Sequence, residues 1–201
     1  MPGNCLFGFK NHRNYNLRMN RRIFHRTVVG LIAAPALLPA HSLAQSNNSG
    51  DAKVQSLPAA LLWLDQLQAA PGIKTSGAWP LSAILEHLSQ SIEMSMDGFP
   101  ALKSELFQRT LGTAAFTVFK WRGNMSHSLS EPIPGAPVLT PAPAWQPAAL
   151  RLRNAITRFE LHKTALKPHF AYGTLSKSDY ALAHTMHIAN HQDEIALHRL
   201  A

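Results

Sequence analysis

Apolar side chains recur every three or four residues along most of the chain after residue 56, which is the spacing of amphipathic helices. The pattern predicts four main helices, over residues 57–68, 79–96, 147–166 and 176–200. A further apolar region, 102–121, has a break at Gly112. We find no internal repeat and none of the strict apolar/polar alternation that is typical of strands. The sequence therefore predicts an all-α fold, a four-helix bundle over residues 56–201.

Residue types with strong positional preferences mark the helix ends. Pro58 falls in the first turn of the first helix, where proline is tolerated, and Pro71 follows its end. Ser176 and Asp179, three residues apart, have the form of a capping box for the last helix. From there to Leu200 nothing in the sequence breaks the helical pattern.

Residues 122–147 form a long segment without helical periodicity, with seven prolines or glycines between Gly123 and Pro143. It predicts one long crossover loop in the bundle. Loops of this length in small domains are often functional. The alternative is a rigid, proline-rich strap over one end of the bundle.

The last predicted helix carries polar side chains where a bundle normally places leucine or isoleucine. They follow one another at steps of three and four residues: Tyr180, His184, His187, His191, Glu194 and His198. An unpaired polar group in an apolar interior costs roughly 2–7 kcal/mol. These histidines therefore need partners, and a metal ion would serve several of them at once.

Three histidines form the candidate metal site. His187 and His191 are four residues apart, so they share one face of a helix. His87 borders the apolar stripe of an inner helix. Three imidazoles with an open coordination position are typical of a catalytic rather than a structural zinc, and the ligand type also suits nickel or iron. The alternative is that these histidines are hydrogen-bonded core residues or face solvent.

The neighbours of these ligands supply further candidates. We expect His184, Tyr180 or Glu194 to act as proton donor or acceptor, with His184 also a candidate wall residue or fourth ligand. His198 is expected at the surface. Four acidic residues close to the ligands are candidates to orient an imidazole: Glu86, Glu93, Asp193 and Glu194.

The N-terminal segment changes the interpretation of the net charge of +8. Six of the 19 Lys and Arg residues lie before residue 45, where there is no acidic residue, and the remainder has 13 basic and 11 acidic residues. A net charge of +2 on the remainder is not the footprint of a nucleic-acid-binding protein, so we expect no nucleic-acid partner.

The same segment has the layout of an export signal. Arg21 and Arg22 precede an apolar stretch at 28–38, which is too short to span a bilayer comfortably, and small residues follow at Ser42 and Ala44. We predict a cleavable twin-arginine signal over residues 1–44, with the twin-arginine export machinery as partner. An N-terminal membrane anchor or a core helix is the alternative.

Several expectations follow for the mature chain. Met19 directly precedes the twin-arginine motif and is a candidate start, which would make residues 1–18 a mis-assigned extension. Residues 45–55 are polar and predict a flexible linker. The only cysteine, Cys5, lies in the removed segment, so the mature protein has neither a disulfide nor a thiol nucleophile. We expect a periplasmic or secreted protein without a stable membrane anchor after cleavage, and leave a homodimer open.

The chain resembles the DinB-like (YfiT-like) proteins over about residues 56–201. Trp79-Pro80-Leu81-Ser82 followed by His87 is similar to the start of their second helix, and His187-Ile188-Ala189-Asn190-His191 to their C-terminal His-x-x-x-His helix. Their second histidine is commonly followed by Arg-Gly-Gln, where this chain has Gln192, Asp193 and Glu194. The segment from Pro168 to Ser176 resembles one in a DinB-related family of unknown function.

The resemblance implies a four-helix bundle with a divalent metal bound by His87, His187 and His191 at one end of an inner cavity. Relatives include thiol-dependent transferases and isomerases. Our first hypothesis is an exported metal-dependent hydrolase or transferase of a small molecule, with zinc, nickel or iron as cofactor. The alternatives are a non-catalytic protein that binds a metal or a small ligand, and a bundle without metal.

Overall fold

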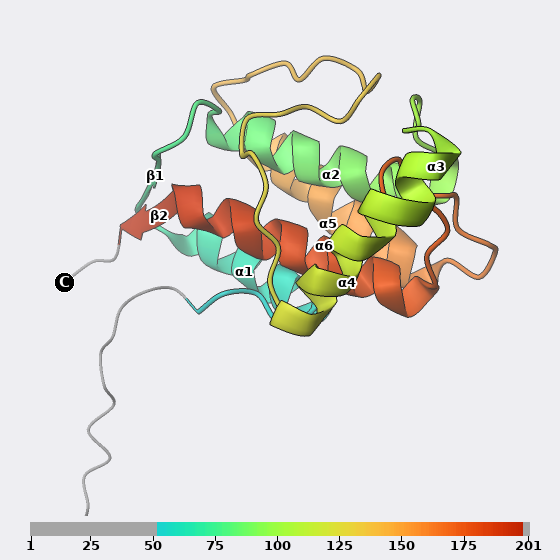
Figure 1. The fold of residues 1–201 in the computed structure, drawn as a ribbon. Helices are drawn as coiled ribbons and strands as arrows, with labels where there is room; N and C mark the ends of the chain where they lie inside the picture. Colours follow the sequence, from blue (N-terminus) through green and yellow to red (C-terminus); the bar gives the residue numbers. More distant parts are fainter. Residues whose placement is uncertain (1–51, 199–201) are drawn as a thin grey trace, which may run out of the picture. The chain divides into compact units, whose positions relative to one another are not determined.

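The computed structural model describes residues 52–198, and these form a helical bundle (Figure 1). Its four main helices are α1 (Leu57–Ala69), α2 (Leu81–Asp97), α5 (Gln146–Leu161) and α6 (Lys177–His191). Helices α2 and α5 make the most extensive pairwise packing. The all-α prediction is confirmed. The predicted signal segment, residues 1–44, lies outside the described residues.

The core lies between these four helices and is formed by the predicted apolar stripes. Its largest fully buried aliphatic side chains come from all four helices: Leu64, Leu67, Ile84, Leu85, Leu88, Ile92, Leu152, Ile156 and Ile188. The predicted cap of α6 is present, because the Ser176 hydroxyl accepts a hydrogen bond from the backbone N–H of Asp179. Helix α5 ends at Leu161, earlier than the predicted Leu166.

A helical segment of three elements lies between α2 and α5. A short α3 (Glu105–Phe107), a π-helical turn (Gln108–Gly112) and α4 (Thr113–Arg122) follow one another without a gap. The predicted break at Gly112 is therefore wrong. Gly112 is instead a point of close packing, since a Cβ atom there would overlap the carbonyl oxygen of Ala171.

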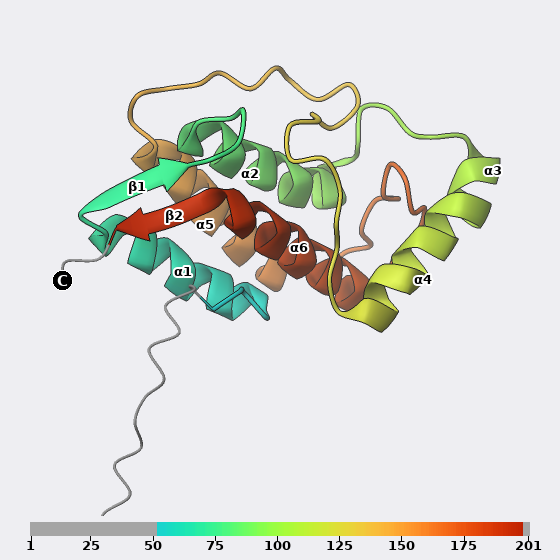
Figure 2. The ribbon, with the colours of Figure 1, turned by 60° about the vertical axis from the view of Figure 1, so that its left-hand side comes forward.

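The predicted long crossover loop follows α4 and leads to α5 (Figure 2). Hydrogen bonds attach the loop to the bundle along its length. The Asn190 side chain on α6 donates to the carbonyl of His127, and Gln90 on α2 donates to that of Pro137. The Ser82 hydroxyl, also on α2, donates to the carbonyl of Ala142. The first part of the loop thus covers the C-terminal part of α6, and the later part of the loop covers α2.

A small antiparallel sheet corrects the prediction for the C-terminus. Helix α6 ends at His191, and a 3-10 turn (Gln192–Glu194) leads into β2 (Ile195–His198), which pairs with β1 (Gly72–Thr75). The expected absence of strands and the expected helix to Leu200 are both wrong. The strands pair residues over a hundred positions apart, so local periodicity did not reveal them.

The N-terminal part of the described chain is attached to the bundle. Val54, within the range predicted as linker, is buried, and its backbone N–H donates to the Gln192 side chain at 2.7 Å. Between residues 52 and 198 no helix has both the length and the hydrophobicity needed to cross a membrane.

Candidate metal centre

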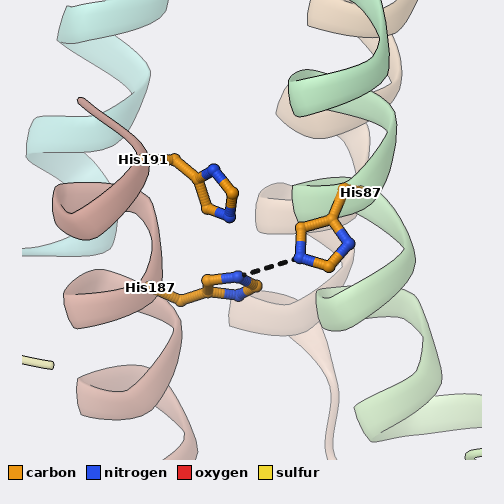
Figure 3. Close-up of side chains that lie close together, drawn as sticks. All are labelled: His87, His187 and His191. Carbon is orange, nitrogen blue, oxygen red and sulfur yellow. Dashed lines mark hydrogen bonds between the residues drawn. The ribbon is translucent and has the colours of Figure 1, made fainter. Parts of the chain in front are cut away.

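The three predicted ligands come together between α2 and α6 (Figure 3). One ring nitrogen from each of His87, His187 and His191 lies within 4.8 Å of the other two. The Nε2 atoms of His87 and His187 are 3.2 Å apart. The sequence left open whether residues 87 and 187 face each other, and the structure shows that they do. This cluster could hold one metal ion.

Burial keeps the three rings neutral. Desolvation, followed by the field of His127, lowers the pKa of His87 to about 4. Desolvation likewise lowers the pKa of His191 to about 3, and that of His187 falls well below its usual 6.5 for the same reason. A neutral imidazole is the form that binds a metal, so the cluster is prepared for a cation at neutral pH.

Hydrogen bonds on the far side of two rings fix which nitrogen faces the cluster. The Nδ1 of His191 lies 2.7 Å from Glu194 Oε1, and that of His187 lies 3.2 Å from the Ser91 hydroxyl. A carboxylate can only accept, so His191 carries its proton on Nδ1 and presents the Nε2 lone pair. That Nε2 atom is buried and has no hydrogen-bond partner among residues 52–198.

These observations fit a metal better than a purely hydrogen-bonded cluster. A buried lone pair without a donor is costly, and here it faces two further imidazoles. A metal-binding histidine almost always donates its other ring N–H to a carboxylate, a backbone carbonyl or water, and Glu194 is such an acceptor for His191. Trp79 closes one side of the histidine cluster. Its ring centroid lies 5.0 Å from that of His87, and its ring stacks on that of His191 with the centroids 6.3 Å apart.

The small sheet places Glu194. The backbone N–H of Ser76 donates to the Glu194 carbonyl at 2.8 Å, directly beyond the Thr75–Ile195 pair. The carboxyl group lies against Gly77, where a Cβ atom would overlap Oε2. Burial raises the pKa of Glu194. The element missed by the sequence analysis therefore holds the residue that orients His191.

The other acidic candidates have different partners. Glu86 and Glu93 on α2 both bind the guanidinium of Arg151 on α5, at 2.6 and 2.7 Å. Asp193 binds Lys53 at 2.7 Å. Only Glu194, of the four acidic residues proposed to orient an imidazole, has a histidine of the cluster as partner in the described chain.

The remaining predicted residues lie further along α6 or beyond it. The Tyr180 hydroxyl donates to the Lys167 carbonyl at 2.7 Å, inside the core. His184 is buried, with Nε2 3.2 Å from the Ser95 hydroxyl. His198 is exposed on β2, as expected, although the expected helix is absent there.

A cavity of about 170 Å³, the side cavity, adjoins the cluster. It lies between α2, α6, the crossover loop and the turn before α6. Its lining residues are His87, Ser91, Met125, His127, Glu131, Pro132, Ile133, Pro134, His169, Phe170, Tyr172, Ala183, His184 and His187. The predicted wall role of His184 therefore agrees with its position.

His127 is the functional candidate that the sequence analysis did not select. Its ring lies 4.8 Å from that of His187 and 5.8 Å from that of His191, between ring centroids. Its Nδ1 lies 2.8 Å from the Ser128 carbonyl, which leaves the Nε2 lone pair free. A loop residue has no periodicity to identify it; the available signal was that it is the one histidine in the segment 122–147.

Comparisons with known proteins give a family but no activity. No curated protein and no solved structure matches the chain. One family model, described as "Protein of unknown function (DUF1569)", matches residues 46–197. This match spans the entire histidine site and most of the chain, and the protein therefore belongs to the DUF1569 family.

Proposed function

We propose that the protein is a metal-dependent hydrolase or transferase of a small molecule, with zinc, nickel or iron held by Nε2 of His87, His187 and His191. One observation carries the proposal. The buried Nε2 of His191 has no partner in the described chain, faces two neutral imidazoles, and belongs to a ring that Glu194 orients. The order of Trp79 and the three histidines also supports kinship with the DinB-like proteins.

The residues around the cluster then have separate roles in binding the metal and in catalysis. A divalent ion in this position supplies Lewis acidity to a substrate donor atom. Glu194 holds the His191 ring in the required tautomer, and Ser91 holds the orientation of the His187 ring through its Nδ1. Trp79 excludes water from one side. His127 lines the cavity with its Nδ1 against the Ser128 carbonyl, and we assign it the role of general base through Nε2.

A second candidate function rests on the same His127. Its ring lies as close to His187 as the ligand rings lie to one another. A small loop movement would make it a fourth ligand, and a filled coordination sphere is typical of a structural or carrier site. His184, the fourth ligand considered from sequence, contacts Ser95 instead. The side cavity favours the enzyme.

Elemental analysis of the purified full-length chain tests the metal. We expect about one equivalent of a transition metal in the wild type and in His198→Ala, and none in His187→Ala. Metal-free wild type would refute both candidate functions. In a cobalt-substituted form, an anion that changes the visible spectrum identifies an open position and supports the enzyme, whereas an unresponsive spectrum supports the carrier.

We further propose that the protein is exported through the twin-arginine pathway to the periplasm or beyond. The support is the sequence of residues 1–44, with Arg21 and Arg22 ahead of the apolar stretch. The full-length chain should reach the periplasm of a bacterial host, and changing both arginines to lysine should retain it in the cytoplasm. Equal export of both chains would contradict this proposal.

A further inference from the structure

The side cavity contains one buried hydrogen-bond donor that the site described above does not use. His169 lies in the turn between α5 and α6 and lines the cavity. It is 8 % exposed. Along α6, His184 is three residues or about 4.5 Å from His187, and His169 lies beyond it, next to Tyr180. The cavity therefore extends from the metal ligands toward His169.

The backbone determines the tautomer of His169. Its Nδ1 accepts the backbone N–H groups of Ala171 at 3.1 Å and Tyr172 at 3.2 Å. A ring nitrogen that accepts two hydrogen bonds carries no proton, so the proton of this neutral ring is on Nε2. This Nε2–H has no hydrogen-bond acceptor among the described residues, although the ring borders the cavity.

The ring is held in place on several sides. Tyr172 stacks on it in parallel, with centroids 4.2 Å apart, and Phe99 packs on it at 5.1 Å. The turn is closed by two backbone hydrogen bonds between His169 and Gly173, at 2.8 and 3.1 Å. A fixed donor can recognise a ligand acceptor without first losing conformational freedom.

The size and charge of the cavity restrict its ligand. A cavity of roughly 150 Å³ in another protein holds benzene, so about 170 Å³ holds one ring with a small substituent. No Lys or Arg is among the lining residues, and burial lowers the pKa of the His169 and His184 rings to about 3. In the metal-free chain an anion would therefore be buried without a counter-charge, which is strongly unfavourable.

We infer that the side cavity is the substrate subsite of the protein and that His169 selects a small, uncharged carbonyl compound with an apolar body by donating Nε2–H to the carbonyl oxygen. That the bound compound is a substrate rests on the proposed function. Recognition of the compound by His169 is independent of it, because His169 donates to the carbonyl without the metal.

Three probes of similar shape test the inference on the full-length chain with metal removed by a chelator. Acetophenone has the carbonyl acceptor, ethylbenzene lacks it, and benzoate adds a charge. Titrations followed by nuclear magnetic resonance should show acetophenone binding roughly two- to tenfold more tightly than ethylbenzene, which is the worth of one net hydrogen bond. Benzoate should bind most weakly. Equal affinity for the first two, tight binding of benzoate, or no saturable binding overturns the inference.

Two matched variants locate the effect. In His169→Asn the amide oxygen can take the place of Nδ1, so both turn N–H groups keep an acceptor, while the distal donor is lost. The preference for acetophenone should then disappear. His162→Asn, the same change at a partly exposed residue of the same inter-helix segment, should preserve it. Circular dichroism of both variants checks the fold, and a preference that survives in His169→Asn refutes the assignment.

Metal content separates this inference from the proposed function. His169→Asn should bind as much metal as the wild type, since His169 is not a ligand. If the wild-type chain contains no metal when purified but still prefers acetophenone, the proposed metalloenzyme is refuted and the His169 subsite is retained. A metal-loaded chain without this preference would do the opposite.

Discussion

The two halves of α6 carry the same kinds of residue in the same core-facing positions, yet they have different chemistry. In the N-terminal half, protein groups satisfy the polar atoms: Tyr180 donates to the Lys167 carbonyl, and His184 contacts Ser95. In the C-terminal half, His191 keeps a buried Nε2 without a partner in the described chain. The hydrogen-bond partners of each polar atom, rather than residue type, distinguish a histidine held by protein groups from one that could bind a metal.

Replacing a residue in each half should give the largest contrast. We expect His191→Ala to lower metal affinity by more than the roughly 10–100-fold that loss of a residue supporting a ligand costs. Tyr180→Phe should leave metal affinity unchanged, because its hydroxyl is bonded elsewhere. Competition with a chromophoric chelator measures both. If His191→Ala keeps wild-type affinity, the ligand assignment is wrong.

Glu194 tests whether the small sheet serves the metal site. Glu194→Ala should weaken metal binding about 10–100-fold, because the His191 ring loses the acceptor that fixes its tautomer. The matched control is Glu93→Ala, which removes a carboxylate bound to Arg151 and should not change metal affinity. Equal affinities of the two variants would show that Glu194 does not orient the ligand.

The sequence predicted the three histidines of the cluster better than the residues that contact them. His87, His187 and His191 were accessible because helix spacing and apolar stripes place side chains on faces. The end of α6 at His191 could not be predicted from the sequence, because the strand that follows pairs Ile195 with Thr75, far away in the chain.

The residues around the ligands were less accessible still. Glu194 was one of several acidic candidates, and only the strand pairing places it beside His191. His127 comes from a loop, and the tautomer of His169 depends on a turn whose backbone N–H groups converge on Nδ1. Periodicity encodes helix faces, whereas these contacts depend on chain geometry outside helices.

Acid should destabilise the metal-free protein through its buried histidines, and His184 represents the N-terminal half of α6 in this effect. Burial lowers the pKa of His184 from 6.5 to about 3. The unfolded chain takes up a proton below about pH 6.5 and the folded chain does not, so the free energy of unfolding falls as the pH drops from about 6.5 toward 3. His184→Gln, which can still donate to Ser95, should show a weaker pH dependence in urea titrations at pH 7 and 5. An unchanged slope would contradict the buried neutral state.

The smallest expected effect is on the stability that the N-terminal half of α6 contributes. Tyr180→Phe leaves the buried ring in place but removes the donor to the Lys167 carbonyl, so the free energy of unfolding should fall by about 0.5–1.5 kcal/mol. Denaturant titration of the metal-free chain measures it. Added metal should stabilise this variant and the wild type equally, because stabilisation by a ligand depends on its affinity for the folded state. Unequal stabilisation would mean that the two halves of α6 are coupled and that satisfied and unsatisfied polar groups do not act independently along this helix.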